Sequence, residues 1–468
     1  MTLLTKLREI VGDSHVLTDA DTGKYDHDWT GKYKATPIAV IRPASTQEVS
    51  DVVKACAASK TAIVPVSGNT SLAGGTYAKD AVMISMERLN DIREIRPDAR
   101  IAIVGAGAVL SSIHDAADAH DLVFPLTFGA KGSAMIGGAL STNAGGSNVV
   151  RYGSTRGLCL GLEVVLPDGQ IMNLMSELHK DNSGYDLKNL MIGAEGTLGL
   201  ITSAVVKLFP KPRAYATAMV AVPALTDALT LLNDLQAATG GLVEAFEYMD
   251  ALYITDYLTM YPKARTPFAD AHDINIMVEI GATAPSLTDV QPDGTVPLIS
   301  LLEETLAPMM EDGRILDAIV AQNETQRREM WERREAAGEV MLLRKPMINN
   351  DICLPVDKVA TFFERIDLRL ADLDPKALYS SVSHLGDGNI HFLVFPTKDD
   401  AGLVDLLTEA VEEVVLSLGG SFSAEHGIGL TKKPSMARRK DKVALGVMRA
   451  MKAAIDPDNI MNPGKVLP

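Results

Sequence analysis

The sequence has few cysteines and no long uninterrupted apolar stretch. Its three cysteines, Cys56, Cys159 and Cys353, are far apart, and no two of them form a C-x-x-C pair. A disulfide framework is therefore not expected, and an iron–sulfur cluster held by this chain alone would need more thiolates. Because no run of about eighteen apolar residues occurs, we also expect no membrane-spanning helix.

Positive charge is scarce as well, since the formal net charge is −16. An acidic surface repels both nucleic acid and anionic membranes, so neither is expected as a partner. Residues 1–13 carry apolar side chains at helical spacing, interrupted by Lys6, Arg8 and Glu9. This pattern favours an amphipathic helix over a signal peptide, and we expect a cytoplasmic protein.

A change of pattern near residue 212 divides the chain, and 468 residues are too many for one typical core. Before Pro210 and Pro212, short strands alternate with glycine-rich turns. After them, strands alternate with longer helices, which is typical of an antiparallel sheet covered by helices. We predict an α+β fold with an N-terminal helical segment (1–35), a glycine-rich domain (36–212), a substrate or cap domain (213–425) and a C-terminal helical segment that returns to the glycine-rich domain (426–468).

Two glycine-rich stretches have the composition of a dinucleotide site. PVSGNTSLAGG, residues 65–75, directly follows an expected strand, and its glycines let backbone N–H groups converge on an anion such as a pyrophosphate. The second stretch, residues 125–157, is too long for one turn and would wrap a large ligand. A plain surface turn and a flexible linker are the alternatives, but linkers lack apolar residues such as Met135 and Ile136.

A further glycine pair supports a weaker alternative. Gly105 and Gly107 lie between an expected strand and an expected helix, as in a nicotinamide-binding fingerprint. Leu110 stands in place of the third glycine, and no acidic residue closes a following strand. We interpret this segment as a tight turn, and we keep a nicotinamide-dependent dehydrogenase as an alternative.

Histidines and a carboxylate gather in two short motifs of the second half. His384 and His391 flank the turn at residues 386–389, which brings their strands side by side, and Glu425 precedes His426 in SAEHGIG. Two imidazoles and one carboxylate suit Zn²⁺ or Mn²⁺, with Glu425 as the third ligand and one position open for substrate. For a single histidine, an ordinary polar residue at a turn would be the better interpretation.

These motifs resemble the vanillyl-alcohol oxidase / p-cresol methylhydroxylase superfamily, in particular its D-lactate, D-2-hydroxyglutarate and glycolate dehydrogenase group. Four motifs occur in the right order: PVSGNTSLAGG, GAKGSAMIGGALSTNAGG, HKDNSGYDLKNLMIGAEGTLGLIT and MNPGK. The resemblance covers residues 36–468 and implies a two-part FAD-binding domain of the vanillyl-alcohol oxidase type plus a C-terminal domain. Ser67 replaces a usual glycine. Because residues 65–75 contain no histidine, we expect FAD to be bound non-covalently.

The resemblance also implies which residues contact FAD, most of them glycines and small polar residues. They are Pro65, Ser67, Gly68, Asn69, Thr70, Ser71, Gly74, Pro125, Gly132, Ser133, Gly137, Gly138, Thr142, Asn143, Gly145, Gly146, Glu195, Gly196, Gly199, Ile201 and Asn462.

The same resemblance implies how a 2-hydroxy acid would be oxidised. It places a divalent metal on His384, His391 and Glu425, where the ion would bind the substrate hydroxyl and a carboxylate oxygen. His426 is the expected general base, because imidazole titrates near the working pH, and Asn389 would support the site. The C2 hydride would pass to flavin N5.

The substrate carboxylate needs a cation, and the segment MWERREAAG offers Arg333 and Arg334. A solvated helix face is the alternative, but the family's Trp-x-x-Arg-Glu pattern favours Arg334, whose guanidinium can form two hydrogen bonds. The D-2-hydroxyglutarate branch has a Thr four residues later and a Lys fifteen residues later, where Gly338 and Asn349 stand here. Leu393 also replaces an Asn. These departures favour D-lactate or a hydroxy acid with an apolar tail.

Several alternatives stay open. The substrate could be D-2-hydroxyglutarate, or the chain could be the flavin subunit of a glycolate oxidase-type complex, an oxygen-using oxidase or a non-catalytic flavin carrier. Without cluster cysteines, electrons are expected to leave to a quinone, an electron-transfer flavoprotein or a cytochrome. The resemblance also implies a homodimer.

Overall fold

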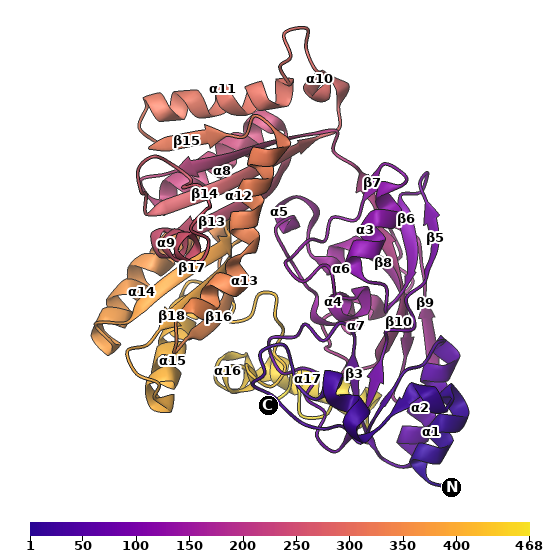
Figure 1. Cartoon of the computed structure of the whole chain (residues 1–468). Helices are drawn as coiled ribbons and strands as arrows, with labels where there is room; N and C mark the ends of the chain where they lie inside the picture. Colours follow the sequence, from indigo (N-terminus) through magenta and orange to yellow (C-terminus); the bar gives the residue numbers. More distant parts are fainter.

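The computed structural model describes residues 1–468, and its secondary structure forms two blocks that lie side by side (Figure 1). The first block contains the N-terminal part of the chain and the last residues, and the second contains the residues between them. The predicted α+β fold, with a helix-covered antiparallel sheet in its C-terminal part, is confirmed.

The first block holds a four-stranded sheet in the order β1-β2-β4-β3 and a five-stranded antiparallel sheet in the order β5-β6-β10-β8-β9. The strands are β1 (Val16–Leu17), β2 (Ala39–Ile41), β3 (Ala62–Val66), β4 (Ala81–Ser85), β5 (Ile92–Arg96), β6 (Ile101–Gly105), β8 (Cys159–Val165), β9 (Ile171–Leu174) and β10 (Leu200–Lys207), with a separate pair, β7 (Leu122–Val123) and β11 (Phe209–Pro210). The helices are α1 (Leu3–Val11), α2 (Thr46–Ala58), α3 (Leu110–Asp118), α4 (Ile136–Thr142), α5 (Val149–Tyr152), α6 (Thr155–Leu158) and α7 (Leu187–Met191).

Local sequence signals set two of these elements. Ser45 caps α2, because its hydroxyl accepts the Glu48 N–H at 3.1 Å while the Glu48 carboxylate accepts the Ala44 N–H at 2.8 Å. β8 and β9 pair as a hairpin, and Gly169 takes the left-handed φ of 82° in its turn. Both elements are therefore set by residues only a few positions apart in the sequence.

The second block is built on one seven-stranded antiparallel sheet in the order β15-β12-β14-β13-β17-β18-β16. Its strands are β12 (Ala214–Ala221), β13 (Val243–Asp250), β14 (Ile274–Ala282), β15 (Asp317–Val320), β16 (Ile348–Cys353), β17 (Leu378–His384) and β18 (Asn389–Phe395). Its helices are α8 (Leu225–Thr239), α9 (Ala251–Met260), α10 (Pro285–Thr288), α11 (Pro297–Glu311), α12 (Glu324–Glu335), α13 (Ala337–Val340), α14 (Val359–Leu373) and α15 (Ala401–Ser417).

The two faces of this sheet have different partners. Phe246 and Phe392 point into a large apolar core that is shared with α8, α11, α14 and α15. Met249 and Val382 belong to a smaller cluster shared with α9, α12 and α13. Because side chains alternate along a strand, His384, two residues after Val382, and His391, next to Phe392, both lie on the face of the smaller cluster.

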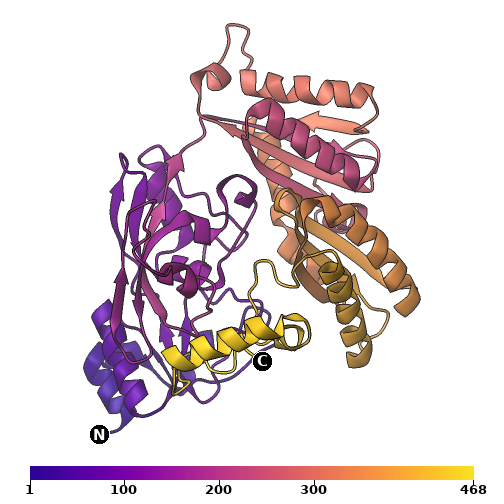
Figure 2. The ribbon, with the colours of Figure 1, turned by 180° about the vertical axis from the view of Figure 1, so that it is seen from behind.

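The C-terminal segment returns to the first block through α16 (Lys433–Arg439) and α17 (Lys442–Ile455), which runs along that block in Figure 2. Ile460 and Met461 are buried in the first core, and Met461 bridges to Ile63 of β3. None of the helices is long and apolar enough to cross a membrane.

Candidate functional site

A cavity of about 410 Å³ is lined by residues of both blocks. From the first block, the glycine-rich stretches supply small and polar residues, and from the second block, β17, β18 and α12 supply histidines, apolar residues and an arginine. Among the residues that the sequence predicts for FAD, the cavity wall contains Pro65, Ser67, Gly68, Asn69, Thr70, Ser71, Gly138, Thr142, Gly145, Glu195 and Asn462.

The other predicted FAD contacts do not line this cavity. They are Gly74, Pro125, Gly132, Ser133, Gly137, Asn143, Gly146, Gly196, Gly199 and Ile201. A Cβ added at Gly196 would lie 2.3 Å from the Pro65 side chain, and Asn143 Oδ1 accepts the Arg156 N–H at 2.9 Å. These two positions shape the loops behind the wall.

The first-block wall fits the cofactor that the sequence implies. A Cβ at Gly68 would lie 2.1 Å from the Ser133 carbonyl oxygen, so only glycine lets the two stretches approach each other there. Asn69 adopts a left-handed φ of 52°, and the buried Oδ1 of Asn462 has no hydrogen-bond partner in the protein. Small residues let the backbone approach a dinucleotide closely, and the unpaired Asn462 oxygen is available to hydrogen-bond to it.

The second-block wall gathers His384, His391 and Glu425. Strands β17 and β18 pair so that Val382 lies opposite His391, and the two imidazole centroids are 5.4 Å apart. His384 Nε2 and His391 Nε2 each lie 3.9 Å from a Glu425 carboxylate oxygen. Burial raises the Glu425 pKa to about 7. This set of two imidazoles and one carboxylate fits a divalent ion, with one donor atom from each residue within 4.8 Å of the others.

Glu247, which sequence reasoning missed, joins His384 to Arg334. Its carboxylate is fully buried, lying 2.9 Å from His384 Nδ1 and accepting Arg334 Nε–H at 2.5 Å. Burial alone would raise the Glu247 pKa, but the charges of His384 and Arg334 lower it to about 2. With Nδ1 facing Glu247, His384 presents Nε2 toward Glu425. No local pattern singles out Glu247, because its strand VEAFEYMD carries three acidic side chains, Glu244, Glu247 and Asp250.

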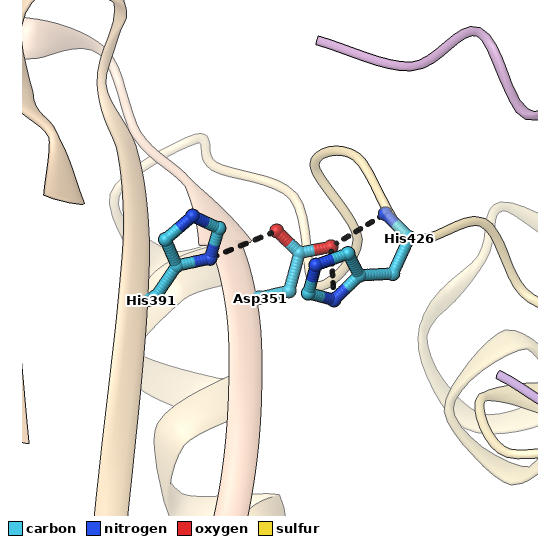
Figure 3. A group of neighbouring side chains, drawn as sticks. All are labelled: Asp351, His391 and His426. Carbon is cyan, nitrogen blue, oxygen red and sulfur yellow. Dashed lines mark hydrogen bonds and ion pairs between the residues drawn. The ribbon is translucent and has the colours of Figure 1, made fainter. Parts of the chain in front are cut away.

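Asp351 was also missed, and it lies between His391 and His426 (Figure 3). It is almost completely buried on β16, directly opposite His391 in the strand register. Its Oδ1 lies 3.8 Å from His391 Nδ1, and its Oδ2 lies 3.5 Å from His426 Nδ1. Burial opposes ionisation, but the neighbouring His426 and the Lys432 ammonium hold the Asp351 pKa well below its usual range.

His426 and Asn389 take different positions around this group. The His426 ring lines the cavity and stacks on His391 with centroids 5.6 Å apart, and burial lowers its pKa, which favours the neutral, proton-accepting form. Asn389 does not line the cavity, since its Nδ2 donates to Asp351 Oδ1 and to the Ile352 carbonyl, both at 3.0 Å. Asn389 therefore supports the site from behind.

The second-block wall combines apolar side chains, such as Val382 and Phe395, with polar ones such as Ser380. Gly338, Asn349 and Leu393, the three positions that depart from the D-2-hydroxyglutarate pattern, all line it. Arg334 is the only arginine in the wall, which contains no lysine. The nearby Arg344 is paired in a bidentate manner with Asp256, at 2.6 and 2.7 Å. The cavity therefore offers one cationic side chain besides its histidines.

Comparison with known proteins identifies the family. Residues 37–175 match the model of an FAD binding domain, and residues 211–466 match that of the C-terminal domain of FAD linked oxidases. A probable mitochondrial D-2-hydroxyglutarate dehydrogenase of Oryza sativa subsp. indica is 34% identical over 98% of this chain and 81% of its own length. The D-2-hydroxyglutarate dehydrogenase of Stutzerimonas stutzeri (strain A1501) is 32% identical over 99% of this chain and 98% of its own length.

Solved structures show the same fold. The structure of p-cresol methylhydroxylase with substrate bound has a TM-score of 0.75 at 15% identity, covering 99% of this chain and 96% of its own. Alkyldihydroxyacetonephosphate synthase has a TM-score of 0.73 at 16% identity, covering 99% and 86%. The chain therefore belongs to the FAD-linked oxidases, in the family that contains these D-2-hydroxyglutarate dehydrogenases, and it is an FAD-linked oxidoreductase with the fold of p-cresol methylhydroxylase.

Proposed function

We propose that this protein oxidises the CH–OH group of a D-2-hydroxy acid to the 2-keto acid, with FAD as the electron acceptor. The observation that carries the proposal is a single cavity in which the glycine-rich wall meets His384, His391, Glu425, His426 and Arg334. These side chains can bind a carboxylate and accept a hydroxyl proton beside a cofactor-sized wall.

The protein's own residues would divide the work as follows. Arg334, fixed by Glu247 and lying 3.2 Å from His384 Nδ1, binds the substrate carboxylate and so places C2 against the first-block wall. His426, neutral because of burial, takes the hydroxyl proton. Bound FAD supplies the hydride acceptor, and a divalent ion held by His384, His391 and Glu425 would supply Lewis acidity at the hydroxyl.

D-2-hydroxyglutarate is the specific substrate that the comparisons support best. The relatives described above carry that name, and they match nearly the whole chain. They give no support to the D-lactate preference that the departures at Gly338, Asn349 and Leu393 suggest. Quinone, electron-transfer flavoprotein or cytochrome is our proposed electron acceptor, with the chain acting as a homodimer.

A monocarboxylate with an apolar tail is the second candidate, and the lining beyond Arg334 favours it. No second arginine or lysine faces this part of the cavity, where Val382, Leu393 and Phe395 lie in the wall. A second carboxylate buried there would lack a cationic partner, which is costly.

The test is anaerobic titration of the flavin-loaded protein with D-2-hydroxyglutarate, D-lactate and D-2-hydroxyisocaproate, with the L-enantiomers as controls. Bleaching of the flavin band by a D-acid but not by its L-enantiomer supports the proposal. The acid that bleaches the band fastest shows which side chain of the substrate the cavity prefers. Chelation should abolish bleaching while the flavin spectrum stays, and Zn²⁺ or Mn²⁺ should restore it. A flavin band that no 2-hydroxy acid bleaches would contradict the proposed reaction.

A further inference from the structure

The segment that carries Glu425 and His426 is attached to the second block by one buried carboxylate. Asp351 Oδ2 accepts the backbone N–H of Glu425 at 3.0 Å and that of His426 at 2.9 Å. The Lys432 ammonium donates to the same oxygen at 3.1 Å, seven residues after Glu425. Both ends of this turn are therefore fixed on a single side chain of β16.

The same carboxylate faces the δ nitrogens of two histidines with different tasks. His391 turns Nδ1 toward Oδ1 and Nε2 toward Glu425, and His426 turns Nδ1 toward Oδ2 (Figure 3). At 3.8 and 3.5 Å these contacts are longer than hydrogen bonds, but the negative charge favours a proton on each Nδ1, which leaves Nε2 with its lone pair. Nε2 is then free to bind an ion in His391 and to accept a proton in His426.

Asp351 itself is poorly suited to bind an ion, although it lies with His391 and His426 in a second metal-like group. Its side chain is only 1% exposed and does not line the cavity. Oδ1 already accepts from Asn389, and Oδ2 accepts from two backbone N–H groups and an ammonium. An ion would have to displace the Lys432 charge, so the contacts assign Asp351 to orientation.

We propose that Asp351 is a positioning residue that sets the metal ligand His391 and the base His426 at the same time, so that metal binding and proton removal depend on one carboxylate. The proposal deepens the proposed function and rests on it for the role of His426. The role of Asp351 in metal binding rests on the geometry of His391 and Glu425 alone.

The test compares Asp351→Asn with Asp374→Asn as a matched control. Asp374 is another buried carboxylate of the second block, and it accepts hydrogen bonds from the N–H and hydroxyl of Thr397 at 2.8 Å. Flavin content and visible circular dichroism report folding, and Zn²⁺ affinity is measured by competition with a chromophoric chelator. In Asp351→Asn, we expect Zn²⁺ affinity to fall about 10- to 100-fold, the range seen when groups behind metal ligands are changed.

At saturating metal, the same variant should lose at least about tenfold in kcat while the substrate KM stays within about threefold, because Arg334 still binds the carboxylate. Asp374→Asn should leave both quantities within about twofold. Wild-type metal affinity and kcat in Asp351→Asn would overturn the proposal, as would equal losses in the control.

A second variant covers the case in which Asp351→Asn does not fold. Asn389→Ala removes the hydrogen bond to Oδ1 together with the one to the Ile352 carbonyl, so Zn²⁺ affinity should fall several-fold, and unchanged affinity would count against the proposal. If no hydroxy acid bleaches the wild-type flavin, the proposed function fails, whereas the Zn²⁺ measurement still tests the orientation of His391.

Discussion

Arg333 and Arg334 are neighbours on α12, yet their side chains have different partners. Arg334 is held by Glu247 in the cavity wall, whereas Arg333 donates to the Arg265 carbonyl at 2.8 Å and lies over the Tyr257 ring. A lysine at position 334 keeps the charge but loses the planar fork. We expect Arg334→Lys to raise KM for the hydroxy acid at least about tenfold, with bound flavin unchanged.

Steady-state kinetics check this prediction, with Arg333→Lys as the neighbouring control. The control should keep KM within about twofold of wild type, because Arg333 does not line the cavity. Equal effects of the two substitutions would mean that α12 as a whole, and not the Arg334 fork, sets substrate affinity.

Substitution of Asn349 tests whether the substrate carries a second carboxylate. It lies opposite Leu393 in the strand register, lines the cavity, and has a buried Oδ1 without a partner. Asn349→Lys combined with Gly338→Thr should raise kcat/KM for D-2-hydroxyglutarate about tenfold or more, because a cation would then face the second carboxylate. The value for D-lactate should change less than about threefold. If the ratio of kcat/KM for D-2-hydroxyglutarate to that for D-lactate did not change, the second carboxylate would not bind near position 349.

At the scale of single elements, Gly68 in the loop after β3 controls how closely two glycine-rich stretches approach. A Cβ there would meet the Ser133 carbonyl at 2.1 Å, whereas a Cβ at Gly132 meets nothing within 4 Å. We expect Gly68→Ala to lower FAD affinity at least about tenfold, since backbone must move to admit the methyl group. Fluorescence titration with FAD measures this, and Gly132→Ala should bind FAD like wild type. Equal affinities would show that the contact does not shape the cofactor site.

Helix α9 has a titratable N-cap that predicts a pH effect. Asp250 accepts N–H groups from Tyr253 and Ser381 at 2.7 Å, and burial raises its pKa to about 6. Between about pH 4 and pH 6 the folded protein then holds a proton that the unfolded chain has lost. The free energy of unfolding should therefore fall as pH rises through this window, by at most roughly 3 kcal/mol.

Denaturant unfolding of wild type and Asp250→Asn at several pH values checks this. The difference between the two should shift in favour of Asp250→Asn as pH rises from 4 to 6, because the amide cannot ionise. A difference that is constant over this range would mean that Asp250 titrates normally.

At the scale of the whole molecule, an ion pair joins the two blocks. Arg151 of α5 donates to Glu244 of β13 at 2.6 Å and to the Gly281 carbonyl at 2.7 Å, and the Tyr152 hydroxyl donates to Glu244 as well. Glu244→Gln leaves the Arg151 charge without an anionic partner. We expect the free energy of unfolding to fall by about 2 to 3 kcal/mol, seen as a lower thermal midpoint. In contrast, Glu94→Gln, in an exposed pair with Arg96, should change it by less than about 0.5 kcal/mol.

Local patterns in the sequence were enough for much of this molecule. The capping box at Ser45, the hairpin at Gly169 and the α+β organisation follow from hydrophobic periodicity and turn chemistry, which act between residues a few positions apart. The four ordered motifs gave the family and FAD for the same reason, because each motif is a continuous stretch. His384 and His391 could be paired because one hairpin turn joins them.

Only the tertiary structure shows that Glu247 and Asp351 belong to the site. Glu247 reaches His384 and Arg334 across 137 and 87 positions, and Asp351 reaches the His426 backbone across 75. No local pattern marks such an acid, because its purpose depends on which strands become neighbours in the seven-stranded sheet. The sequence predicts that the C-terminal segment returns to the first block, but the contact itself, in which Ile428 and Gly429 donate to the Glu195 carboxylate, is likewise long-range. Residue types and local order determined the fold and cofactor, whereas strand order and block packing decided which charges meet.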